Sequence, residues 1–206
     1  MNMIITHETF NPENMIFKVV KTKFGQRIQI KYNYPGGIDD FHIQTPALKS
    51  CSLIYNRFLR FNSFGFSMIV TMYERQLGPT EEESKTISML ESILERIQDY
   101  ILAEGLSKKH VVEEMTIFRQ KEGKPPKMYL KLKTAYRSTD SILPRPAQIT
   151  TGFYNTDGRQ IDPLTLISKP IRCRAVLDLT CSVFIGSGKP SVQLRVEDAV
   201  LAERTE

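Results

Sequence analysis

One segment of this chain predicts a long amphipathic helix, and this helix constrains the fold because strand-like segments lie on both sides of it. Thr80 and Glu83 have the spacing of a capping box, and Gly78 and Pro79 precede them as helix breakers. Gly105 fits a C-terminal cap. Between these ends the apolar residues recur at three and four positions, which places on one face Ile87, Leu90, Leu94, Ile97 and Ile101. The stripe is that of a helix packed on a core.

The flanking segments predict a mostly antiparallel sheet. Short runs of alternating apolar and polar residues, bounded by glycine, proline and asparagine turns, are typical of strands. They cover residues 15–20, 27–34, 41–45, 64–73, 127–133, 148–154, 171–185 and 191–200. Strands and helices do not alternate, which argues against a doubly wound parallel fold. The predicted class is α+β and mostly antiparallel β, and closure into a β-barrel is one arrangement of such strands.

Length and composition predict an intracellular globular chain. The 206 residues are 41% hydrophobic and 25% charged, which is too apolar for a disordered protein. We expect an N-terminal arm (residues 1–14), a single domain (15–200) and a C-terminal tail (201–206). The cysteines Cys51, Cys173 and Cys181 lack metal-site spacing, so neither disulfides nor zinc are expected. No run approaches a membrane span, and the first residues do not resemble a signal peptide.

Catalytic motifs are weak. The chain contains neither GxSxG nor HExxH. Gly186 to Lys189 resembles a phosphate-binding loop, but Pro190 and a strand follow it where a Walker motif enters a helix. Asp39 with Asp40, and the acidic run 81–83, are explained by a turn and by the helix dipole. We therefore expect a protein that is not an enzyme and that has no cofactor or metal.

The strand over residues 127–133 carries the strongest functional signal. Lys127, Tyr129, Lys131 and Lys133 fall on one parity, whereas the residues between them are Met and Leu. Lysines that follow a phosphate backbone and a ring that stacks on a base form one wall of a single-strand groove. The alternative is a solvated strand whose lysines only block edge pairing.

Basic residues also cluster elsewhere. They occur on the strands near residues 18–31, beside aromatic rings at 57–61, and near the final strands. The candidate nucleic-acid-binding residues are Lys18, Lys21, Lys23, Arg27, Lys31, Arg57, Arg60, Phe61, Lys124, Lys127, Tyr129, Lys131, Lys133, Arg137, Arg172, Arg174 and Lys189. Among the aromatic residues we expect Tyr129 and Phe61 to be exposed, because charged residues surround them.

Three segments together resemble a known family. They are Ile43-Gln44-Thr45-Pro46, the run from Gly123 to Lys133, and the run from Phe184 to Lys189. In this order they resemble the single-stranded-DNA-binding proteins of nucleocytoplasmic large DNA viruses, the relatives of iridoviruses, phycodnaviruses and asfarviruses. The resemblance implies an OB-like β-barrel with one long amphipathic helix and added strands. It also implies sequence-independent binding of single-stranded DNA during viral genome replication, repair or recombination.

Two functions therefore remain as alternatives. The first is a non-enzymatic protein that binds single-stranded DNA, or RNA, in the host cytoplasm or nucleus at viral replication sites. A homo-oligomer and replication proteins are its expected partners, and a membrane is not. The second is a viral structural or assembly protein, a minor capsid or core component with a β-sandwich fold, which would be found in the virion.

Overall fold

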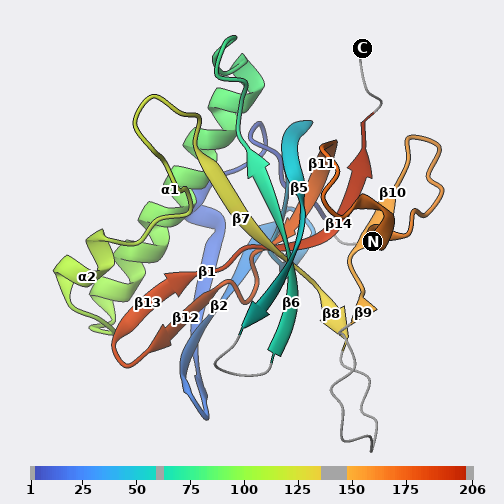
Figure 1. Cartoon of the computed structure of the whole chain (residues 1–206). Coiled ribbons are helices and arrows are strands. Elements are labelled where there is room, and N and C mark those ends of the chain that lie inside the picture. The colour runs from blue at the N-terminus through green and yellow to red at the C-terminus, as the bar shows by residue number, and fades with distance from the viewer. Residues whose placement is uncertain (1–2, 59–62, 136–147, 203–206) are drawn as a thin grey trace, which may run out of the picture.

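The computed structural model describes residues 3–58, 63–135 and 148–202, and it confirms a mostly antiparallel α+β fold (Figure 1). The strands are β1 (Met15–Thr22), β2 (Gly25–Tyr34), β3 (Gly37–Asp40), β4 (His42–Gln44), β5 (Leu48–Phe58), β6 (Ser63–Thr71), β7 (Lys127–Leu132), β8 (Thr134–Ala135), β9 (Gln148–Ile149), β10 (Gly152–Tyr154), β11 (Ile171–Asp178), β12 (Val183–Gly186), β13 (Lys189–Val192) and β14 (Arg195–Leu201). The helices are α1 (Glu81–Ala103) and α2 (Lys109–Glu113), with 3-10 turns η1 (Pro12–Asn14) and η2 (Pro163–Leu166).

Five strands of the larger sheet pair in a ring. β5 pairs with β6, and β6 pairs with β7, in both cases antiparallel. β7 pairs with β14 in parallel, and β14 pairs antiparallel with β11. β11 in turn pairs antiparallel with β5, so the pairing leads back to its starting strand. β4 and β10 extend this sheet through β11 and β14.

The smaller sheet packs its apolar face inward. Its strand order is β1-β2-β12-β13, and β3 pairs with β2. Ile28, Ile30 and Tyr32 of β2 are fully or almost fully buried. Gly25 begins β2 with a φ of +146°, and a Cβ there would collide with the carbonyl oxygen of Ile185. The glycine therefore lets the β1–β2 hairpin lie close against β12.

An aromatic cluster, consisting of Phe10, Tyr32 and Phe41, joins the N-terminal segment to this sheet. The rings of Tyr32 and Phe41 stack with centroids 5.0 Å apart, and Phe10 lies 6.3 Å from each of them. The Tyr32 hydroxyl accepts a hydrogen bond from the Asn11 backbone N–H at 2.7 Å. The buried hydroxyl is therefore satisfied, and the cluster fixes residues that precede β1.

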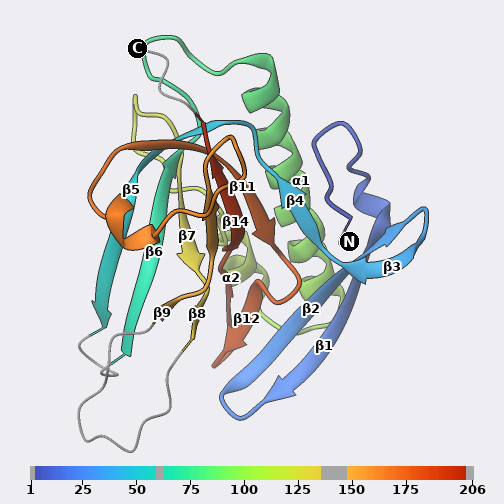
Figure 2. The same cartoon turned by 90° about the vertical axis from the view of Figure 1, so that its right-hand side faces the viewer.

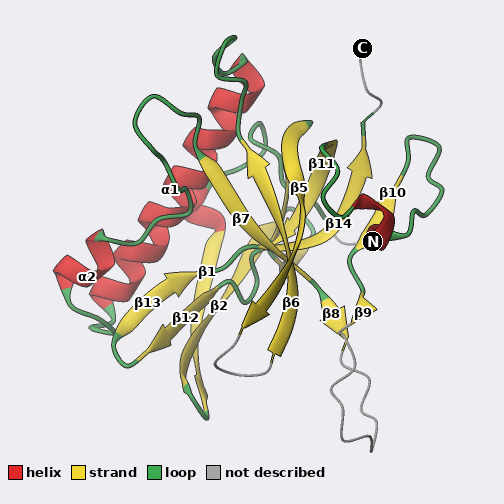
Figure 3. Ribbon diagram, in the orientation of Figure 1, coloured by secondary structure: helices red, strands yellow, loops and turns green. Residues whose placement is uncertain are grey.

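The long helix α1 begins and ends as the sequence predicts, and it lies along one flank of the strands (Figures 2 and 3). Thr80 and Glu83 form both hydrogen bonds of a capping box. Beyond the end of the helix, Gly105 has a φ of +62° and the Leu106 N–H bonds to the Ile101 carbonyl. Within the part of the chain that the structure describes, no helix is both long and apolar enough to span a membrane.

The buried face of α1 is shifted from the predicted stripe. Leu90, Ile97 and Ile101 are buried as expected, but Ile87 and Leu94 are only half-buried. The helix instead buries Thr86, Met89 and Ile93. The ring of Phe17 in β1 stacks on that of Tyr100 in α1, with centroids 4.7 Å apart, so the helix also contacts the smaller sheet.

The sequence missed one central strand. The strand expected at residues 64–73 is present as β6, and it lies between β5 and β7. β5 itself was not predicted, because its first residues are mostly polar and a bulge between Ser50 and Ser52 interrupts the alternation. The expected strand 148–154 is divided into β9 and β10, and the expected strand 171–185 into β11 and β12.

Candidate nucleic-acid interface

The alternation of β7 divides its side chains between core and surface as predicted. Met128, Leu130 and Leu132 are buried at 5% exposure or less. On the opposite face Tyr129 is 42% exposed, and Lys127 and Lys131 are half-buried. This face, together with Arg119 and Arg195, is called here the β7 face.

Arg119 covers part of the Tyr129 ring. Its guanidinium carbon lies 4.5 Å from the ring centroid, within the range of a cation–π contact. The position is fixed by the backbone, because Arg119 and Lys127 exchange two hydrogen bonds of 2.8 and 3.0 Å. The contact places a positive charge over one face of the ring while Tyr129 stays 42% exposed, which suits the stacking of a base next to a phosphate.

Two cationic side chains, Lys131 and Arg195, are neighbours two residues beyond Tyr129 on the same face of the sheet. Lys131 of β7 and Arg195 of β14 are paired in the parallel register. The pKa of Lys131 lies below its ordinary value, first because burial removes water from the ammonium and then because Arg195 adds positive charge. A phosphate between the two side chains would offset both effects, so the arrangement favours an anion.

Lys133 continues the same parity, but it is turned toward carboxylates. Its ammonium forms an ion pair and a hydrogen bond with Glu197, and it lies 3.6 Å from Asp178. His42 is buried, and its Nε2 lies 3.8 Å from the same Glu197. The sequence placed Lys133 with the phosphate-binding lysines, whereas the structure places it in this acidic cluster of His42, Asp178 and Glu197.

The acidic cluster has the donor types of a metal site. Its three potential ligand atoms lie within 4.8 Å of one another, and the buried Nδ1 of His42 has no hydrogen-bond partner among the described residues. Carboxylate and imidazole ligands suit a divalent cation. The Lys133 ammonium, however, already provides the positive charge there, so a metal ion would compete with it for the same oxygens.

Removing the Lys133 ammonium is expected to destabilise the fold. In a Lys133→Met variant two carboxylates would remain close together without their cation. Because the Lys133 and Glu197 side chains are each 33% exposed, we expect a loss of about 1–2 kcal/mol, less than for a fully buried pair. Urea unfolding measures this loss. Lys124→Met, at an exposed turn, is the matched control and should unfold like the wild type; equal stability of both variants would contradict the ion-pair role.

The basic residues of the β1–β2 hairpin lie on two faces. Lys18 and Arg27 are exposed, and the register places them with Lys31 on the outer side of the smaller sheet. Lys31 is paired with Asp40 at 3.6 Å. Lys21 lies on the other parity, and Lys23 lies in the turn with its ammonium 5.7 Å from the Phe24 ring.

The basic residues of β11 are also separate from the β7 face. Arg172 and Arg174 are exposed and line a hollow whose other wall includes the helix-terminal acids Glu81, Glu82 and Glu83. These carboxylates compete with phosphate for the arginines.

The remaining predicted residues divide between exposed turns and undescribed positions. Lys124 is exposed in the turn before β7. Lys189 is exposed next to Gly188, whose carbonyl accepts a hydrogen bond from the hydroxyl of Ser107, a residue that precedes α2. Arg60, Phe61 and Arg137 lie outside the described residues, and only the backbone of Arg57 is described.

Sequence reasoning missed Arg119 and Arg195. Arg119 lies in a segment without helical or strand periodicity. Arg195 does alternate with buried residues of its strand, but only the parallel pairing of β14 with β7 brings it to Lys131. The sequence pattern of β14 could have predicted that Arg195 points outward, but it could not have predicted that Arg195 lies beside Lys131.

The strand pairing defines a mostly antiparallel α+β protein whose fold occurs in known structures. The structure resembles gp2.5, a single-stranded-DNA-binding protein encoded by bacteriophage T7, with a TM-score of 0.55 and 11% identity, over 82% of this chain and 89% of gp2.5. It also aligns with the single-stranded-DNA-binding protein of bacteriophage Enc34, solved with DNA, with a TM-score of 0.45 and 10% identity, over 92% and 97% of the two chains.

The chain belongs to the family described as Protein of unknown function (DUF2738), whose model matches residues 9–206. A relative in sequence is the Early 31 kDa protein of Frog virus 3 (isolate Goorha), which is 27% identical over 153 residues. The match covers 67% of this chain and 54% of the relative, so the chain spans about half the length of that protein.

Proposed function

We propose that this protein binds single-stranded DNA without strong sequence preference, and that it does so without catalysis. The observation that carries the proposal is the β7 face, on which a partly exposed ring and four cationic side chains converge from separate segments. Cations along the strand hold phosphates, and Tyr129 stacks a base.

The proposed architecture behind this face is an OB-type barrel. In the ring β5-β6-β7-β14-β11, the consecutive strands β5, β6 and β7 form an antiparallel meander. β7 then pairs in parallel with β14, which is the last of the five strands in the sequence. That order supports an OB-type barrel, in which the outer surface of the second and third strands takes the nucleic acid. In this chain those two strands are β6 and β7. The fold resemblance to gp2.5, a single-stranded-DNA-binding protein, supports the proposed binding of single-stranded DNA.

The biological setting is proposed from the relatives. Similarity to an early protein of Frog virus 3, an iridovirus, supports a role in a large DNA virus. We place this protein at intracellular sites of viral genome replication, where exposed single strands need protection. Replication proteins and further copies of the chain are its proposed partners.

Fluorescence anisotropy with labelled oligonucleotides tests the function directly. The protein is expected to bind oligo-dT at low salt, with a logarithm of affinity that falls linearly as the logarithm of salt concentration rises. The expected slope is on the order of 2–3 if three or four phosphates are neutralised, at about 0.7 per phosphate for single strands. A duplex of the same length is the competitor.

Two results would count against the proposal. If oligo-dT is not bound at low salt, the protein is not a single-strand binder. If duplex DNA is bound as well as oligo-dT, the face is a general DNA contact, and the structural or assembly role is then favoured.

A further inference from the structure

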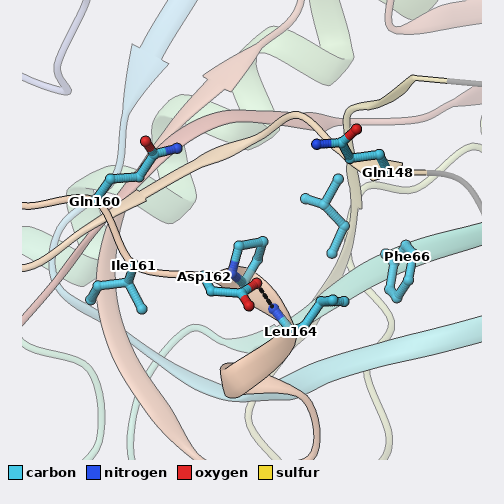
Figure 4. Close-up of a pocket in the computed structure, with 8 residues that line it drawn as sticks. Phe66, Gln148, Gln160, Ile161, Asp162 and Leu164 are labelled. Carbon is cyan, nitrogen blue, oxygen red and sulfur yellow. Dashed lines mark hydrogen bonds between the residues drawn. The ribbon is translucent and has the colours of Figure 1, made fainter. Parts of the chain in front are cut away.

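One cavity, drawn in Figure 4, is lined by none of the residues of the β7 face. It has a volume of about 600 Å³. Its wall comes from β6, β9 and the segment around η2. Neither the proposed phosphate contacts nor the proposed stacking ring lies within it.

The chemistry of the cavity suits a neutral planar ring. Phe66 is 6% exposed and forms an apolar wall, and Leu164 is 57% exposed. The carboxamides of Gln148 and Gln160 point toward each other across the space (Figure 4). A carboxamide both donates and accepts hydrogen bonds, so two of them can pair with the polar edge of a nucleobase while apolar side chains contact its faces.

The charges around the cavity argue against a phosphate. Asp162 lines it with a carboxylate, one oxygen of which accepts the Leu164 N–H at 2.9 Å. None of the described residues that line it carries a positive charge. An anionic group would be repelled there, whereas an uncharged base would not.

A strand bound along β7 would reach this cavity at its β9 side. Lys131 pairs with Ser67, whereas Phe66, the next residue of β6, points to the opposite, buried side of the sheet. β8 follows β7 and pairs with β9, so Ala135 lies opposite Gln148. Four residues of extended chain separate Lys131 from Ala135, a distance of about 13 Å, which a few nucleotides span.

We infer that this cavity receives one unstacked base of the bound single strand, held between the Gln148 and Gln160 carboxamides and the Phe66 wall. The inference rests on the proposed function, because it takes the strand along β7 as the source of the base. The protein would then bind the phosphate backbone of the single strand on the β7 face, and it would bind one base of the same strand in the cavity past the end of β7.

Free nucleosides test the cavity without any phosphate contact. Adenosine and thymidine are titrated into the full chain, and backbone and side-chain amide shifts are followed by NMR. We expect saturable shifts at residues 148–149, 160–162 and 164. Gln148→Leu and Gln160→Leu keep the side-chain size but remove the amide, and each is expected to weaken nucleoside binding about fivefold. Gln76→Leu, on an exposed turn, is the control.

The outcomes separate this inference from the proposed function. If no shifts occur in the cavity while oligo-dT still binds, the inference is wrong and the function stands. If nucleosides change the NMR shifts of the cavity residues but oligo-dT does not bind, the cavity binds bases and the proposed function is wrong. If N-acetyl-phenylalanine amide binds there more tightly than either nucleoside, the cavity receives an aromatic side chain of a protein instead.

Discussion

Reversing the charge of Lys127 and Lys131 together is expected to reduce the affinity for oligo-dT at low salt by on the order of 100-fold. Both side chains lie on the β7 face, and a hydrogen bond to a charged group is worth about 1.5–3 kcal/mol. The salt dependence should fall as well, by about 1.4 in slope for two lost phosphate contacts. Anisotropy titrations at several salt concentrations measure both quantities for Lys127→Glu with Lys131→Glu.

The control changes the net charge equally at another place. Lys108 and Lys109 are exposed at the start of α2, and Lys109 lies 3.8 Å from Glu113. Lys108→Glu with Lys109→Glu should retain most of the affinity and the full salt slope. Equal losses in the two double variants would show that only total charge matters, and the β7 face would then not be the binding site.

Replacing Phe41 by alanine is expected to lower the free energy of unfolding by about 3–5 kcal/mol. Phe41 is fully buried and stacks on Tyr32. Its removal would leave a cavity in the aromatic cluster that joins the N-terminal segment to the smaller sheet. Denaturant unfolding, followed by circular dichroism, gives the change in stability.

Phe24 provides the matched control for this substitution. Its side chain is 79% exposed at the β1–β2 turn. Phe24→Ala is therefore expected to change the stability by no more than about 0.5 kcal/mol. A loss as large as that of Phe41→Ala would mean that the hairpin turn is buried in the protein in solution.

Local patterns made most elements of this fold predictable. The capping box of α1 and the alternation of β7 each depend on residues a few positions apart, and the structure confirms both. β5 was missed because its first residues are mostly polar and a bulge interrupts its alternation, although it pairs with both β6 and β11. Its place in the sheet depends on partners that period and propensity do not encode.

In the candidate site too, local sequence patterns predicted some features, whereas others depend on contacts between distant segments. The parity of β7 predicted Tyr129 as an exposed ring among lysines, and its 42% exposure confirms this. The guanidinium over the ring and the cation opposite Lys131 come from segments that only the fold brings together. Lys133 has the same parity as the others, but its partners come from β11 and β14, so its sequence pattern could not reveal its role.

The late position of β14 affects how the chain reaches its folded state. β14 is the last described strand, yet it pairs with both β7 and β11. While the chain is being synthesised, those two strands keep open edges until residues 195–201 have left the ribosome. Open edges recruit other strands, and such partly folded species aggregate. Fragments that stop before Arg195 are therefore expected to aggregate more readily than the full chain.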